Sequence, residues 1–161
     1  MGLFGMFGKK KESVIGCPVP GEAIPAEQIA DETFASGMLG FTVGVQPAEG
    51  KVFAPADGTI SMLFDTFHAI GMETADGAEL LIHVGIDTVS LKGKHFTPKV
   101  KTGDSVRAGQ LLLEFDGAAI EAAGYQQTTA VIVTNSPDLG EIHAEYGAKA
   151  AGDALLHILK K

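Results

Sequence analysis

Cysteine is almost missing from this sequence, since Cys17 is the only one among 161 residues. A single cysteine excludes an internal disulfide, so the fold has no need of an oxidising compartment. Tryptophan is absent, and basic side chains are few: 12 Lys and Arg stand against 20 Asp and Glu, for a net charge of −8. This charge argues against nucleic acid as a partner and suits a cytoplasmic protein that meets basic surfaces.

A long apolar run is missing from the N-terminus, MGLFGMFGKKKES. Its apolar part is too short for a secretory core or a membrane span. Met6 stands where a myristoylation motif requires Ser or Thr. We therefore expect residues 1–13 to form a flexible basic and apolar tail, attached to a membrane at most peripherally. A single domain is expected to cover 14–161.

Helical periodicity is also scarce. The chain is instead a series of short apolar stretches, such as FTVGVQ, GTISMLF and ELLIHVGI, separated by turn signals such as AEG, ADG and NSPD. Many short strands punctuated by glycine and proline are typical of a β-sandwich or barrel. The sequence therefore predicts an all-β fold of antiparallel strands, with short helical turns only near 27–33 and 116–124.

Two histidines interrupt neighbouring strand-like stretches, His83 in ELLIHVGIDTV and His68 in FDTFHAIGMET. Between them, Asp76 and Gly77 are a strong signal for a two-residue hairpin loop. The register that follows pairs Ala75 with Ala78, Ile70 with His83, His68 with Gly85, and Thr66 with Asp87. Both histidines then share one face of the hairpin, around a gap left by glycine.

A lone histidine in a strand is usually a core residue, but two that converge on one gap indicate a shared task. The candidates are a metal site and the binding of an anionic group. Zinc needs a third protein ligand, for which Asp87 is available. The His-x-His pair of lysostaphin-like zinc peptidases is absent, however, because Val84 and Gly85 follow His83.

The stretch VKTGDSVRAGQLLLEF, residues 100–115, has a pattern that recurs in biotinyl and lipoyl carrier domains. Such carriers need a lysine at a hairpin tip, within Met-Lys-Met or Asp-Lys-Ala, and neither tripeptide is present. The pattern therefore indicates a turn between strands rather than a swinging-arm function.

Two longer segments carry a more specific resemblance. GAELLIHVGIDTVSLKG, residues 77–93, resembles the active-site signature of the glucose-type enzyme IIA domain of the bacterial phosphoenolpyruvate:sugar phosphotransferase system. FAPADGTISMLFDTFHAIGMET, residues 53–74, is similar to the strand that bears the second histidine of that family. The resemblance runs from about Val14 to Lys161. It implies an antiparallel β-sandwich or barrel of the duplicated hybrid motif type, with both histidines in a shallow depression.

The resemblance also implies the chemistry of a phosphoryl carrier. His83 would carry the phosphoryl group on Nε2, with its Nδ1–H donated to the backbone carbonyl of Gly85. His68 would donate a hydrogen bond to a phosphoryl oxygen, and Thr66 would orient His68. Phosphoryl transfer mostly needs such positioning and charge stabilisation. No cofactor is required, although the two histidines could also hold zinc.

The partners implied by the resemblance are the histidine phosphocarrier protein and a IIB or IIBC sugar permease, whose IIB cysteine receives the phosphate. The docking surface carried over from the family consists of Asp31, Phe34, Met38, Leu39, Phe64, Leu81, Val84, Asp87 and Val89. Val84 is its weakest member, because the hairpin register turns this side chain inward. Cys17 is expected to be buried and inert. Two other functions stay open, a regulatory binding module that reports sugar flux to further target proteins and a zinc hydrolase.

Overall fold

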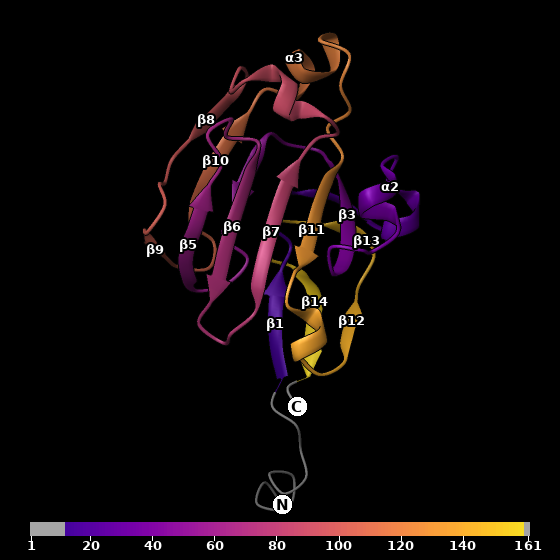
Figure 1. Ribbon diagram of the computed structural model, residues 1–161, viewed down its shortest axis with the longest axis vertical. Helices are drawn as coiled ribbons and strands as arrows, with labels where there is room; N and C mark the ends of the chain where they lie inside the picture. The colour runs from indigo at the N-terminus through magenta and orange to yellow at the C-terminus, as the bar shows by residue number, and fades with distance from the viewer. Residues whose placement is uncertain (1–11, 160–161) are drawn as a thin grey trace, which may run out of the picture.

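The computed structural model describes residues 12–159. Within that range the chain forms antiparallel sheets with only short helical segments (Figure 1), which confirms the predicted fold class. The strands are β1 (Glu12–Gly16), β2 (Gly21–Pro25), β3 (Phe41–Pro47), β4 (Lys51–Phe53), β5 (Gly58–Leu63), β6 (Ala69–Thr74), β7 (Glu79–Val84), β8 (Phe96–Pro98), β9 (Ser105–Val106), β10 (Leu111–Phe115), β11 (Thr129–Val133), β12 (Ile142–Ala144), β13 (Gly147–Lys149) and β14 (Ala154–Leu159). The helical segments are η1 (Ala26–Gln28), α2 (Glu32–Ala35), η2 (Thr88–Leu91), α3 (Gly117–Ala122) and η3 (Ser136–Asp138).

One large sheet dominates the fold, with eight strands in the order β13-β2-β3-β11-β7-β6-β5-β9. Two three-stranded sheets, β1-β14-β12 and β4-β10-β8, accompany it. Figure 1 shows β5, β6, β7 and β11 side by side, with α2 beside β3 and α3 at the upper end of the molecule. None of the described helices is long and apolar enough to cross a membrane.

Alternation along β7 separates its side chains between two faces of the large sheet. Leu80, Ile82 and Val84 are buried in the main core, whereas Leu81 and His83 lie on the opposite face and are half-buried. The short helical segments between β2 and β3 cover part of that opposite face. There Phe34 of α2 packs in a second apolar cluster together with Ile132 of β11.

The β6–β7 hairpin differs from the predicted register by one residue. Its loop has three residues instead of two, because Thr74 N–H donates to the carbonyl of Ala78 (2.8 Å) and Gly77 N–H donates to the carbonyl of Thr74 (3.0 Å). Gly77 has a φ of 94°, as a three-residue hairpin loop requires at its last position. His83 therefore pairs with Ala69, and the pairings predicted around both histidines are wrong.

The two ends of the described chain lie side by side. Glu12 pairs with Leu159, so β1 begins two residues before the expected domain start. The predicted tail, residues 1–13, otherwise lies outside the described residues.

Candidate functional site

His83 is the penultimate residue of β7, between two strands that carry alanine at the paired positions. Ala69 of β6 and Ala130 of β11 are its neighbours across the sheet, and both are buried. A methyl group on either side leaves room for an imidazole to lie on the sheet and be reached from outside. The strand supplies rigidity, because His83 is held by backbone pairing on both sides.

His68 reaches His83 from the residue that precedes β6. Phe67 has a φ of 59°, so the regular alternation of β6 does not extend back to His68. The His68 ring lies edge-on to the His83 ring, with centroids 4.7 Å apart. The hydroxyl of Thr66 is 2.6 Å from Nδ1 of His68. The sequence thus predicted the meeting of the two histidines from a pairing that the structure does not contain, whereas the contact of Thr66 with His68 was implied by the family resemblance.

Two phenyl rings extend the histidine pair at either end. Phe34 lies against His83 with ring centroids 4.8 Å apart, and Phe64 lies edge-on to His68 at 5.7 Å. Phe34 is placed by α2, whose first turn is capped by Asp31: the carboxylate accepts hydrogen bonds from the N–H groups of the second and third residues beyond it. Phe34, His83, His68 and Phe64 thus form a row of four rings, the ring row, in which two imidazoles lie between two phenyl rings.

Burial keeps both imidazoles neutral near pH 7. Burial, followed by the neighbouring His83, lowers the pKa of His68 from 6.5 to about 4. Burial also lowers the pKa of His83, against the opposing effect of the Gly85 backbone and of the Asp31 and Asp87 carboxylates. Each ring therefore keeps one nitrogen lone pair and one N–H, so each can act as a nucleophile or as a hydrogen-bond donor.

Gly85 interacts with His83 and also turns the chain. Its backbone opposes the lowering of the His83 pKa, although the buried Nδ1 of His83 makes no hydrogen bond of regular geometry among residues 12–159. Nor does Gly85 leave a gap opposite His68. Its φ of 87° turns the chain out of β7, and a side chain there would collide with Thr88, whose Cγ2 lies 2.3 Å from the position of an added Cβ.

Residues 13–139 match the family described as "phosphoenolpyruvate-dependent sugar phosphotransferase system, EIIA 1". The chain belongs to this EIIA family. This EIIA chain is 50% identical over 149 residues to the β-glucoside-specific EIIBCA component of Dickeya chrysanthemi, covering 92% of the chain and 24% of that protein. It is 37% identical to the glucose-specific EIIA component of Haemophilus influenzae, over the full length of both.

A solved structure agrees with these sequence relatives. The glucose permease IIA from Mycoplasma capricolum superposes with a TM-score of 0.82 at 29% identity, covering 91% of this chain and 96% of the other. The chain spans about a quarter of the length of the β-glucoside-specific relatives that it matches in D. chrysanthemi and Halalkalibacterium halodurans. As a member of the EIIA family, it is a phosphotransferase component of a sugar phosphotransferase system.

The predicted docking residues of this EIIA domain fall into three groups. Met38, Leu39, Val89 and Asp87 are exposed. Phe64, Leu81 and Asp31 are half-buried, and Phe34 is buried against His83. Val84 is fully buried in the main core, so its place in the docking surface was wrong. The reason is the alternation of β7, which turns Val84 away from His83.

Other side chains of the EIIA domain bear on the remaining predictions. Cys17 is buried, its thiol donates to the carbonyl of Val19, and burial raises its pKa, so a reactive thiolate is disfavoured.

No group of three or more His, Cys, Asp and Glu is placed to hold a metal ion in the part of the chain that the structure describes. A zinc ion between His68 and His83 would lack the third ligand on which a hydrolase depends.

Sequence reasoning missed several residues beside the histidines. Ala69 and Ala130 were not recognised as neighbours of His83, since β11 lies far along the chain and only the sheet order brings it alongside. On β5, the exposed Met62 opposite Gly71 was also not recognised. A bulge at Ser61 shifts the β5 register, and no sequence signal marked it.

Proposed function

We propose that His83 accepts a phosphoryl group on Nε2 from the histidine phosphocarrier protein and passes it to a cysteine of a IIB domain, which couples sugar uptake to sugar phosphorylation. The observation that carries this proposal is the pair of neutral imidazoles in contact on one face of the sheet, with ring centroids 4.7 Å apart.

The chemistry needs a lone pair on one ring and an N–H on the other. The lone pair of His83 Nε2 forms the new N–P bond while the bond from phosphorus to the donor nitrogen breaks, and that electron pair returns to the donor. When the Thr66 hydroxyl donates to Nδ1 of His68, the proton of His68 is on Nε2. That N–H is available to a phosphoryl oxygen and stabilises the charge that spreads over the oxygens in transfer.

The rings of Phe34 and Phe64 limit the access of water to this pair. Exclusion of water matters because hydrolysis would waste a phosphohistidine. Neither step calls for a cofactor, and the proposed donor and acceptor place the chain in the cytoplasm.

Partner docking is proposed on the surface around the ring row. Met38, Leu39 and Val89 offer exposed apolar contacts, and the Asp31 and Asp87 carboxylates offer charge for a basic side chain of the phosphocarrier protein. The β-glucoside-specific relatives are named EIIBCA components, so their names combine a B, a C and an A part in one protein. This combination supports a IIB domain as the acceptor.

The test is labelling with phosphoenolpyruvate, enzyme I and the histidine phosphocarrier protein. One acid-labile phosphate per chain is expected, and His83→Ala abolishes it. His143→Ala, at an exposed histidine away from the ring row, serves as the matched control and keeps full labelling. Labelling of the His83→Ala variant, or an acid-stable phosphate, would contradict the proposal.

A further inference from the structure

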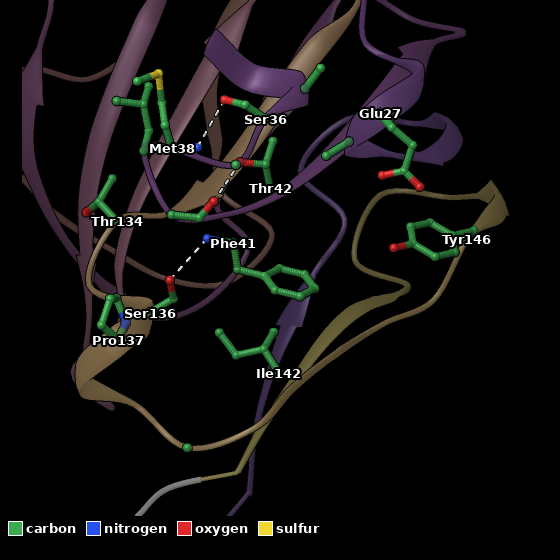
Figure 2. Close-up of a pocket in the computed structure, with 16 residues that line it drawn as sticks. Glu27, Ser36, Met38, Phe41, Thr42, Thr134, Ser136, Pro137, Ile142 and Tyr146 are labelled. Atoms are coloured by element: carbon green, nitrogen blue, oxygen red, sulfur yellow. Dashed lines mark hydrogen bonds between the residues drawn. The ribbon is translucent and has the colours of Figure 1, made fainter. Parts of the chain in front are cut away.

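A cavity of about 630 Å³ opens between the α2–β3 loop and the β12–β13 turn. Its lining includes neither His68 nor His83. Figure 2 shows Phe41, at the start of β3, and Ile142 and Tyr146, of the β12–β13 hairpin, around this space. The cavity is therefore a separate apolar site at the other end of the η1–α2 segment.

Apolar side chains are concentrated at this cavity. Met38 is 73% exposed, Tyr146 48% and Leu39 40%, and all three line it. They are half of the six exposed large apolar side chains in residues 12–159. Such a gathering of apolar surface is typical of a place that another chain segment covers.

Carboxylates are gathered at the cavity. Glu27 is the single charged residue among those that line it, and it borders the same space as Tyr146 (Figure 2). Glu141 directly precedes Ile142, and Glu145 directly precedes Tyr146. Lys149 and His157 already pair with Glu145, and Nε2 of His143 lies 3.1 Å from the Glu141 carboxylate. The surface therefore suits an occupant with apolar side chains followed by positive charge.

A segment of this chain has that composition and begins close by. Residues 1–11, MGLFGMFGKKK, contain four large apolar side chains after Met1 and then three lysines. Glu12 pairs with Leu159, whose N–H donates to the carbonyl of Glu141 (2.8 Å) beside the cavity. Two strand spacings are about 10 Å, whereas eleven extended residues reach about 36 Å. The segment is thus long enough to reach the cavity.

We propose that residues 1–11 dock in this cavity of their own chain, with Leu3, Phe4, Met6 and Phe7 against Met38, Phe41 and Tyr146, and with the lysines over Glu27 and Glu141. The tether favours this occupant over a separate molecule, because a short linker raises the effective concentration to the millimolar range. The proposal shares Met38 and Leu39 with the proposed partner surface, but it does not involve His83, and its test does not depend on phosphoryl transfer.

Cross-linking of engineered cysteines in the full chain tests the docking. Phe4→Cys is combined with Met38→Cys in the cavity, or with Val14→Cys as the matched control. Val14 is 50% exposed on β1, close to where the segment starts, so an undocked segment meets it more often than Met38. Native Cys17 is buried and stays in place. With a bismaleimide, we expect the intramolecular link to Met38→Cys to form at least about tenfold faster than the link to Val14→Cys.

Adding Leu3→Ser and Phe7→Ser should remove this preference, because the apolar contacts are then lost. Equal rates for the two pairs, or faster linking to Val14→Cys, would overturn the proposal. Links formed only between chains would also overturn it and would assign the cavity to a second copy. If the rates are equal and the full chain co-sediments with phosphatidylglycerol vesicles, the apolar residues of the segment serve a membrane surface instead.

Discussion

At the scale of single residues, the proposed mechanism gives His68 and His83 different roles. Both rings are neutral near pH 7 and lie in contact, and the Thr66 hydroxyl lies on Nδ1 of His68. In the proposed mechanism this hydroxyl donates to Nδ1, which leaves Nε2–H of His68 for the phosphoryl group. We infer that His83 forms and breaks bonds to phosphorus, whereas His68 stabilises the group in passage.

His68→Gln separates these roles. The amide can still donate one hydrogen bond, so we expect His83 to accept phosphate. Onward transfer to a IIB cysteine is expected to slow by roughly two to four decades, the range seen when a transition-state donor is lost or weakened. Rapid-quench measurement of both half-reactions checks this. Onward transfer at the normal rate would remove His68 from the mechanism, and release of bound metal by the variant would favour a ligand role.

The pH dependence of stability reports the burial of His68. The unfolded chain gains a proton at this residue near pH 6.5, but the folded chain gains it only near pH 4. Between these values the unfolded state binds more protons, so the stability is complete above pH 6.5 and falls as the pH drops toward 4. His68→Gln should reduce the slope of unfolding free energy in this window by up to about 1.4 kcal/mol per pH unit. Urea titrations of both chains at several pH values measure the difference, and parallel pH profiles would contradict it.

At the scale of elements, the β6–β7 hairpin shows what the sequence could and could not predict. Both strands were predicted because apolar alternation is a local signal. The loop length was not, since Asp-Gly fits loops of two or three residues that differ only in which residues take a positive φ. One residue of slip exchanges the faces of a strand, so the predicted pairings around the histidines failed. His68 met His83 nonetheless, because Phe67 breaks the alternation before β6.

The turn that ends β7 gives a prediction about Gly85. A Cβ there would lie 2.3 Å from Thr88 Cγ2 and 2.9 Å from the carbonyl oxygen of Gln126, at a φ of 87°. Gly77 has a φ of 94° with nothing near an added Cβ, so it serves as the control for backbone strain alone. We expect Gly77→Ala to cost about 1 kcal/mol of unfolding free energy and Gly85→Ala at least about 3 kcal/mol. Equal losses in chemical denaturation would show that the contact with Thr88 is unimportant.

At the scale of the whole molecule, the separate segments that meet at the cavity explain why it was not predicted. Its lining comes from residues 26–42 and from 134–146, which only the strand order brings together. The sequence supplied the family resemblance and hence the architecture. It could not supply contacts between loops that are distant along the chain, because turn signals fix where loops occur and not what they meet.

The described core leads to a prediction about the N-terminal segment. All the buried apolar residues of the two clusters lie between Ile15 and Ile158, so a chain lacking residues 1–11 retains them. We expect this truncated chain to unfold cooperatively and to accept phosphate on His83. Thermal unfolding and phosphate labelling, each beside the full chain, check it. Loss of the folded state would show that residues 1–11 are part of the structural core.

The two outer strands of the eight-stranded sheet are its shortest, with three residues in β13 and two in β9. A sheet edge is normally the place where a foreign strand can add and begin ordered aggregation. Here an incoming strand would find only two or three residues on which to form a ladder. We expect concentrated solutions of the folded protein to stay free of fibrils, as thioflavin fluorescence would report, because the short edge strands protect this fold from self-association.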